Sequence, residues 1–157
     1  MLPDAIIYSD GSSGQKRHGG WGCIVATSAF GVELWGHDYD TTNNRMEMVA
    51  AIKGLKFLSS PHKVMLVSDS AYMLNTIKHK WYKEWFEHNY QRKNMDLWLE
   101  MSELLCYHMV MPVKIKGHSG VEHNERVDKL AKQARINLEE GVSLLYGNFI
   151  GSEDRTG

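Results

Sequence analysis

The chain has 157 residues, 43% of them hydrophobic, and a formal net charge of −1. This length favours one domain with one core, and the balanced charge means that any nucleic-acid surface must be local. No stretch approaches the roughly 18 apolar residues of a membrane helix. The first residues, MLPDAIIYSDG, lack a signal-peptide pattern, so we expect a cytoplasmic protein. Cys23 and Cys106 have no metal-ligand spacing and are expected to be buried free thiols.

The first part of the chain has strand patterns. Residues 5–8 (AIIY) form a short apolar run that stops at the turn SDGS. Residues 19–26 and 32–39 follow at hairpin spacing, with the turn SAFG between them. Three early strands with short connections predict an antiparallel meander.

The pattern then changes to a helical period. Its apolar stripe consists of Met48, Ala51, Ile52, Leu55 and Leu58. Thr41, Thr42 and Asn43 precede the stripe and are candidates for the helix N-cap. We therefore expect a helix that begins near residue 43 and ends before the sequence SSPHK.

The remaining elements alternate between strand and helix. Residues 63–67 (KVMLV) and 112–116 (PVKIK) predict strands, and residues 70–77 predict a short helix. An amphipathic helix is expected over 95–106, with Asn94 as its cap candidate. A last helix carries the stripe Val127, Leu130, Ala131 and Ala134.

This order, β-β-β-α-β-α-α-β-α, predicts an α/β fold. A meander followed by βαβ crossovers implies a mixed five-stranded sheet, part antiparallel and part parallel, flanked by helices. We assign residues 1–140 to this domain. Residues 141–157 are weakly patterned and are expected to form a loosely ordered tail.

Four carboxylates are candidates for one shared site. Asp10 and Asp69 end the first and fourth strands, and parallel neighbours would bring both to the same edge of the sheet. Glu47 and Asp128 border the apolar stripes of two helices. Clustered carboxylates repel and raise one another's pKa, and a divalent cation removes that cost. Oxygen ligands without nearby cysteine favour Mg²⁺ or Mn²⁺, and two such ions support phosphodiester cleavage.

Each acid also has an ordinary interpretation. An aspartate after a strand is usually a turn or cap residue, and an acid on a helix is usually solvated. Only the joint pattern favours a metal site.

Residues 76–93 (TIKHKWYKEWFEHNYQRK) combine basic and aromatic side chains. The segment has a local excess of three positive charges, and Trp81, Tyr82, Trp85, Phe86 and Tyr90 lie between them. Lysine and arginine neutralise phosphates, and flat aromatic rings can pack on nucleic acid. A packed helix with a solvated charged face explains the residues equally well.

Five motifs together resemble the ribonuclease H family, type 1. They are YSDGS at 8–12, TTNNRMEMVAAI at 41–52, VSDSAY at 67–72, NMDLW at 94–98 and KGHSGVEHNERVDKLA at 116–131. The resemblance implies a ribonuclease H-like fold and hydrolysis of the RNA strand of an RNA·DNA hybrid, with 5′-phosphate and 3′-hydroxyl ends. It implies Mg²⁺ as cofactor, with Mn²⁺ as a substitute, and a monomer that binds the hybrid and no membrane.

The resemblance also implies roles for individual residues. Asp10, Glu47, Asp69 and Asp128 would be the catalytic metal ligands, and His118 would be a catalytic auxiliary in a loop flanked by glycines. The substrate-binding residues would be Thr42, Asn43, Asn44, Asn94, Trp81, Trp85, Lys80 and Lys83. Within this set, Asn43 and Asn44 would face the minor groove, and Thr42 and Asn94 would hold a DNA phosphate. Arg45 would form a structural ion pair near the site.

Two departures from the family pattern affect binding positions. The loop after Asp10 lacks the family's common proline, and Lys16, Arg17 and His18 would replace its contacts with charge. Ala71 stands where a glutamine often contacts RNA.

Two other functions remain open. A non-catalytic nucleic-acid binder could use the same fold, although it has no need for four clustered acids. A related nuclease, such as a junction resolvase or transposase core, would lack the paired asparagines and the aromatic-basic segment.

Overall fold

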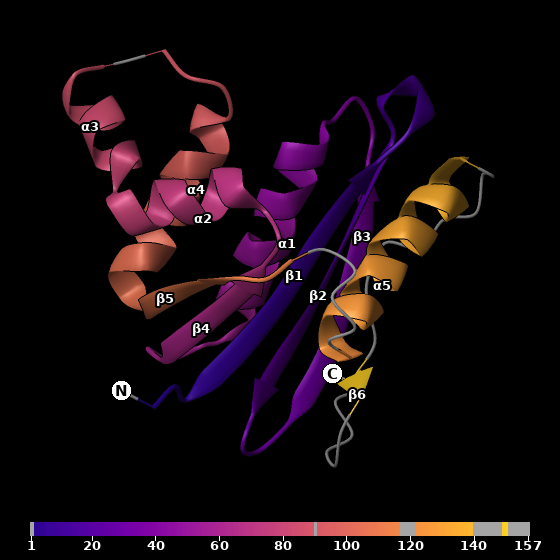
Figure 1. The fold of residues 1–157 in the computed structure, drawn as a ribbon, viewed down its shortest axis with the longest axis horizontal. Helices are drawn as coiled ribbons and strands as arrows, with labels where there is room; N and C mark the ends of the chain where they lie inside the picture. Colours follow the sequence, from indigo (N-terminus) through magenta and orange to yellow (C-terminus); the bar gives the residue numbers. More distant parts are fainter. Residues whose placement is uncertain (1, 90, 117–121, 140–148, 151–157) are drawn as a thin grey trace.

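Figure 1 shows the fold in a computed structural model, which describes residues 2–89, 91–116, 122–139 and 149–150. The described strands are β1 (Ala5–Ser13), β2 (Gly19–Thr27), β3 (Gly31–Asp38), β4 (Lys63–Ser68), β5 (Met109–Lys114) and β6 (Phe149–Ile150). The described helices are α1 (Asn43–Phe57), α2 (Ala71–His79), α3 (Trp81–Glu87), α4 (Met95–Tyr107) and α5 (Glu122–Glu139), with a 3₁₀ turn η1 (Gln15–Arg17).

The strands form one mixed sheet in the order β5-β4-β1-β2-β3-β6. β1, β2 and β3 pair antiparallel, and β4 pairs parallel with both β1 and β5. The predicted five-stranded sheet is therefore present, and the two-residue β6 extends it by pairing with Gly31 and Val32. Tyr8 lies opposite Val67 in the parallel pair, so Asp10 and Asp69 each follow two residues later at the same edge.

Helices cover both faces of the sheet (Figure 1). Successive strand side chains point to opposite faces, so Ile7 of β1 packs beneath Gly54 of α1 while Tyr8 contacts His123 of α5. The larger core lies between the sheet and α1, α2 and α4, and Trp98 of α4 is fully buried there. On the opposite face α5 packs its buried stripe onto β1, β2 and β3.

Several details differ from the sequence prediction. Helix α3 is a separate element, because Lys80 adopts the left-handed conformation (φ 57°) and breaks the path from α2. Cys23 is buried as predicted, but the prediction for Cys106 was wrong, since its side chain is exposed. Cys106 follows the apolar stripe of α4 and falls on its solvent side.

The C-terminal part of the chain lies largely outside the described residues. Within the predicted tail 141–157, only Phe149 and Ile150 are described, and they form β6. Among the helices of the described residues, none is both long and apolar enough to cross a membrane.

Candidate active site

Three carboxylates meet at the edge of the sheet. Asp10 on β1, Glu47 on α1 and Asp69 after β4 each offer one oxygen, and these oxygens lie within 4.8 Å of one another. Asp10 is 6% exposed and Glu47 is 3% exposed. Asp128 of α5 lines the same pocket of about 330 Å³ and interacts with the carboxyl of Asp10. The predicted convergence of four acids from different elements is therefore present in the geometry.

Glycines allow the helices to come close enough for this convergence. A Cβ atom on Gly11 would lie 2.4 Å from the backbone nitrogen of Glu47, so α1 rests directly against β1 at the site. A Cβ atom on Gly20 would lie 2.2 Å from the carbonyl oxygen of Ala131, so α5 lies equally close to β2. These close approaches bring Glu47 and Asp128 toward Asp10 from opposite faces of the sheet.

The electrostatics of this pocket favour a bound cation. Burial raises the pKa of Asp10, a hydrogen bond with the Glu47 carboxyl acts in the opposite direction, and the nearby Asp69 and Asp128 raise the pKa further. Burial also raises the pKa of Glu47, and the charges of Asp10 and Asp69 act in the same direction.

Local contacts offset the repulsion between these acids only in part, and one of them is the ion pair of Asp128 with Lys132 at 3.1 Å. The Gly11 backbone N–H donates to Oδ1 of Asp10 at 2.9 Å, but Oε2 of Glu47 is buried and has no partner among the described residues. An unpartnered carboxylate oxygen beside two other acids fits a metal ion, because a hard cation takes oxygen ligands and offsets their repulsion.

The polar residues at the start of α1 flank the acids. Thr42 is the N-cap, and its hydroxyl accepts a hydrogen bond from the backbone N–H of Arg45 at 3.2 Å. Asn43 and Asn44 are exposed and line the same pocket as the acids. Capping by one of the candidates is thus confirmed, and the amides of both asparagines remain available to a ligand.

Arg45 forms the predicted ion pair. Its guanidinium donates to both carboxylate oxygens of Asp96, at 2.9 and 2.7 Å. It also donates to Oδ1 of Asn94 at 3.3 Å. Asn94 occupies the N-cap position of α4 with φ 65°, but its side chain makes no capping bond, so the prediction of a side-chain cap there was wrong.

Tyr72 is a further residue of the site, for which no motif in the sequence predicts a role. This residue lines the acidic pocket, and its hydroxyl accepts hydrogen bonds from Asn94 at 3.2 Å and from Trp98 at 2.9 Å. The contacts join residues 22 and 26 positions apart. No local pattern in the sequence signals them.

The aromatic-basic segment contributes both core and surface residues. Tyr82 is buried and stacks on Trp98 with ring centroids 5.9 Å apart, and Trp85 meets the same indole edge-on at 6.1 Å. Trp81 is 42% exposed, and Lys80 and Lys83 are exposed. Figure 1 shows α3 on the side of the molecule away from α5. The segment thus exposes Trp81, Lys80 and Lys83 to solvent, while Tyr82 and Trp85 pack against Trp98.

His118 and the basic loop after β1 were also predicted to contribute to the site. His118, with its flanking glycines, lies outside the described residues. In the loop after β1, Arg17 pairs with Asp40 at 2.6 Å and both side chains are exposed. Asp40 thus neutralises the positive charge of Arg17 in this loop.

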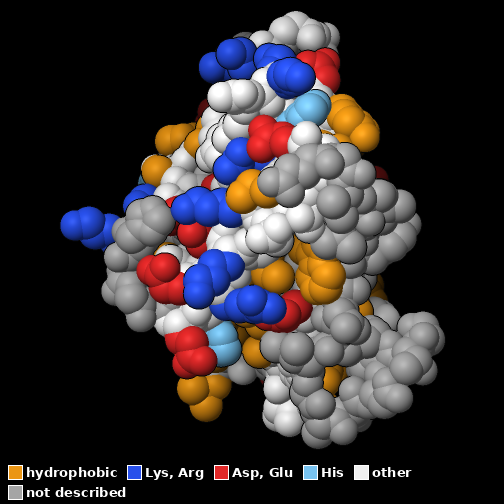
Figure 2. All heavy atoms as spheres, turned by 90° about the vertical axis from the view of Figure 1, so that its right-hand side faces the viewer, with side chains coloured by type: hydrophobic (Ala, Val, Ile, Leu, Met, Phe, Trp, Pro, Cys, Tyr) orange, Lys and Arg blue, Asp and Glu red, His pale blue; other side chains and the backbone are white. Residues whose placement is uncertain are grey.

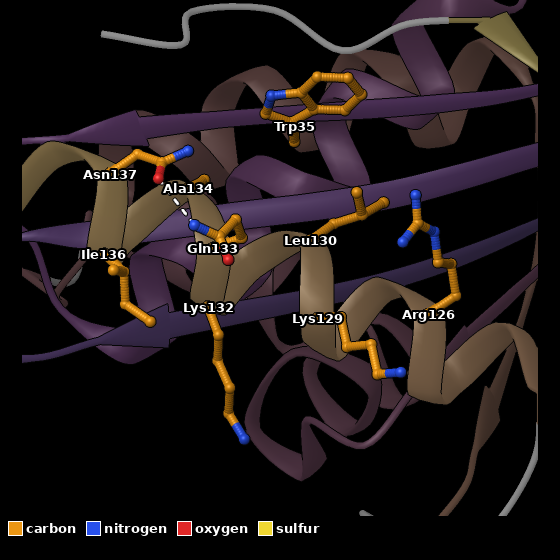
Figure 3. Close-up of a pocket in the computed structure, with 9 residues that line it drawn as sticks. All are labelled: Trp35, Arg126, Lys129, Leu130, Lys132, Gln133, Ala134, Ile136 and Asn137. Carbon is orange, nitrogen blue, oxygen red and sulfur yellow. Dashed lines mark hydrogen bonds between the residues drawn. The ribbon is translucent and has the colours of Figure 1, made fainter. Parts of the chain in front are cut away.

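A second hollow lies between α5 and β3 (Figure 3). This groove of about 460 Å³ has Trp35, Leu130 and Ile136 among its lining residues, and Gln133 donates to Asn137 there at 2.7 Å. No acid is among the described residues that line it. Figure 2 shows basic and acidic side chains interspersed over the described part of the face that carries α5. The described lining of this groove therefore differs from that of the acidic pocket beside Asp10.

Comparisons with known proteins agree with this arrangement. The family model for RNase H matches residues 3–136. The chain is 45% identical over 132 residues to a protein named ribonuclease H from Acetivibrio thermocellus, covering 80% of this chain and 90% of that protein. It is 43% identical over 144 residues to a ribonuclease H from Chlorobium limicola, covering 87% and 99%.

Solved structures are similar in fold. LC9-RNase H1, described as a type 1 RNase H with the type 2 active-site motif, aligns with a TM-score of 0.79 at 24% identity, covering 97% of this chain and 79% of that one. A foamy viral protease-reverse transcriptase in complex with an RNA/DNA hybrid aligns with a TM-score of 0.68 at 22% identity, covering 86% of this chain and 21% of that one.

Proposed function

The chain belongs to the RNase H family, and from that premise we propose that it hydrolyses the RNA strand of RNA·DNA hybrids with divalent metal ions held by Asp10, Glu47, Asp69 and Asp128. The products carry 5′-phosphate and 3′-hydroxyl ends. The observation that carries the proposal is the meeting of two buried acids, from β1 and α1, and a half-buried acid after β4 within 4.8 Å, with Asp128 of α5 in the same pocket.

The acids suit Mg²⁺, with Mn²⁺ as a substitute. They supply several carboxylate oxygens and no sulfur or imidazole, which is the ligand set of a hard cation. A pair of such ions, when bound, activates a water molecule and stabilises the charge on the leaving oxygen of the phosphodiester. Glu47 reaches them from the α1 side and Asp128 from the α5 side, so the two helices fix the ligands relative to the sheet edge.

Other residues bind and orient the hybrid. The exposed amides of Asn43 and Asn44 lie beside the acids and suit the minor groove, where 2′-hydroxyls mark the RNA strand. Thr42 and Asn94 hold a phosphate of the DNA strand. Lys80 and Lys83 neutralise further phosphates, and Trp81 and Trp85 offer flat surfaces to the DNA backbone.

His118 remains a proposed auxiliary. An imidazole near the departing product can carry protons at neutral pH. Its loss would slow the reaction without abolishing it.

A single assay tests this proposal. RNA·DNA, DNA·DNA and RNA·RNA duplexes of the same sequence are incubated with the protein in Mg²⁺ or in EDTA. We expect cleavage in Mg²⁺ but not in EDTA, and only of the RNA strand of the hybrid. The Asp10→Asn protein, prepared identically, should cleave none of the duplexes. Binding of the hybrid without cleavage would instead support the non-catalytic binder, and cleavage of DNA would support a related nuclease.

A further inference from the structure

Tyr72 connects the candidate active site to helix α4. The residue lies in the first turn of α2 and lines the acidic pocket. Its hydroxyl accepts hydrogen bonds from Nε1 of Trp98 at 2.9 Å and from Nδ2 of Asn94 at 3.2 Å. Its ring meets the Trp98 indole edge-on, with centroids 6.0 Å apart. One side chain of α2 therefore contacts both the N-cap and the buried core of α4.

The donors and acceptors around Tyr72 have one consistent arrangement. The indole nitrogen of Trp98 can only donate. Arg45 donates to Oδ1 of Asn94 at 3.3 Å, so the amide must turn its Nδ2 group toward Tyr72. A reversed amide would place two donors, the guanidinium and the NH₂ group, against each other. Arg45 fixes the direction in which the Asn94 amide points, and the Tyr72 hydroxyl anchors the Nδ2 end of the amide in that orientation.

Asn94 is not used as a helix cap. An asparagine at an N-cap ordinarily accepts a hydrogen bond from a backbone N–H in the first turn, but this one makes no such bond. The side chain is half-buried and is directed toward Arg45 and Tyr72. Within the described part of the chain, the second hydrogen of its Nδ2 group has no acceptor. That hydrogen is available to an anionic oxygen of a ligand.

Thr42 and Asn94 both contact Arg45, at opposite ends of that residue. Its backbone N–H is bound by the Thr42 hydroxyl, while its guanidinium binds Asn94 and Asp96. Two groups that can donate to a phosphate thus share one arginine. A hydrogen bond from such a donor to a phosphate is charge-assisted, and it requires that the N–H, not the carbonyl oxygen, faces the phosphate.

We propose that Tyr72 is a positioning residue, whose hydroxyl holds the Asn94 amide in the orientation that donates to a phosphate of the DNA strand. The inference rests on the proposed function, in which Thr42 and Asn94 grip that phosphate. Without the hydroxyl, the amide loses one of the two contacts that hold it in place. Tyr72 therefore contributes to hybrid affinity and leaves the chemical step at the acids unchanged.

Steady-state kinetics of hybrid cleavage at several KCl concentrations test this role. Tyr72→Phe keeps the ring against Trp98 and removes only the hydroxyl. We expect KM to rise about three- to tenfold, as for one lost hydrogen bond to a charged group, with kcat changed less than about twofold. The slope of log(1/KM) against log[KCl] should stay near the parent's, because the Asn94 amide is uncharged and its contact releases no counterion.

A double mutant and a matched control complete the experiment. Tyr72→Phe combined with Asn94→Ala should be no worse than Asn94→Ala alone, because both changes remove the same contact. Tyr107→Phe, at the other end of α4, removes a hydroxyl that donates to the Ser59 carbonyl at 2.9 Å and should leave KM and the salt slope unchanged.

Two results would overturn the inference. One is a Tyr72→Phe enzyme that is less stable but has the parent's KM, which indicates a purely structural hydroxyl. The other is a double mutant whose defect is the product of the two single defects. A parent protein that does not cleave the hybrid would contradict the proposed function itself, and this is seen before any variant is compared.

Discussion

The acidic pocket and the aromatic-basic segment are built in different ways. The acids come from two strand ends and two helices, and the backbones of those helices touch the sheet at glycines. The aromatic-basic segment, residues 76–93, is centred on the seven-residue helix α3, which is attached through Tyr82 and Trp85 to a single indole, that of Trp98. Metal ligands need positions fixed to a fraction of an ångström, whereas stacking and charge neutralisation tolerate movement. We therefore expect substitutions in the acidic pocket to slow the chemical step, and substitutions in the aromatic-basic segment to weaken hybrid binding.

The largest expected effect comes from Asp10→Asn. The change removes a central ligand of the metal site, and we expect cleavage to fall by at least about 10³-fold, or about 4 kcal/mol of transition-state stabilisation. Hybrid binding in Mg²⁺ should fall by less than about tenfold, because the binding residues are unchanged. Rate measurements and fluorescence anisotropy with a labelled hybrid separate the two quantities. Asp40→Asn, an exposed acid paired with Arg17, should change neither.

Gly11→Ala tests whether the close backbone approach sets the acid geometry. The new Cβ would lie 2.4 Å from the Glu47 backbone nitrogen, so α1 must shift away from β1. We expect kcat to fall about 10- to 100-fold, and the free energy of unfolding to fall by about 1–3 kcal/mol.

The matched control for this change is Gly54→Ala. Its Cβ would press on the Ile7 side chain at 2.8 Å, between the same helix and the same strand but among apolar side chains. It should reduce stability and leave kcat near the parent value. A Gly11→Ala enzyme with normal kcat would show that the acids tolerate movement of α1.

Trp81→Ala probes the aromatic-basic segment. Trp81 is 42% exposed, so its loss should cost binding surface without opening a cavity. We expect KM for the hybrid to rise about five- to tenfold, corresponding to about 1 kcal/mol, with kcat within about twofold. The control is Leu99→Ala, which removes an exposed apolar side chain from α4 and should change neither KM nor kcat. An unchanged KM for Trp81→Ala would contradict the assignment of this segment to hybrid binding.

A smaller effect is expected in the pH dependence of metal-free stability. The pKa values of Asp10 and Glu47 are raised in the folded protein, chiefly by burial. Between about pH 4 and the raised pKa values of the folded state, the carboxyls of Asp10 and Glu47 bind more protons in the folded protein than in the unfolded chain. The free energy of unfolding in EDTA should therefore fall as the pH rises through this range.

Asp10→Asn should reduce that fall. At pH 8 in EDTA the variant should be more stable than the parent by about 1 kcal/mol, because one buried negative charge is removed. At pH 4 the two proteins should differ less. Urea unfolding at both pH values measures the difference, and a variant that is less stable at pH 8 would indicate a structural role for the Asp10 carboxylate.

Sequence patterns predicted the parts of the fold that depend on local periodicity. The apolar run at 5–8, the stripe that includes Met48 and Leu55, and the acids at strand ends all have a fixed relation to strand or helix geometry. The edge at which Asp10 and Asp69 meet followed from the expected parallel pairing of their strands. The position of the acids could therefore be predicted from the sequence.

Other features depend on tertiary contacts or on single backbone angles. The separation of α2 from α3 rests on the left-handed conformation of Lys80, which no apolar pattern signals. The contact between Tyr72 and Asn94 depends on how α2 packs against α4, which no local pattern shows. The sequence therefore predicted a helix cap at Asn94, where the structure has a hydrogen bond to Tyr72. The two residues of β6 are too few to give a recognisable strand pattern.

The most direct test of the metal site is a crystal of the protein soaked in Mn²⁺ and measured for anomalous scattering. We predict one or two peaks bounded by Asp10, Glu47, Asp69 and Asp128, with loss of a peak in an Asp10→Asn crystal. A well-ordered pocket with no anomalous peak at saturating Mn²⁺, or peaks confined to other acids, would contradict the account.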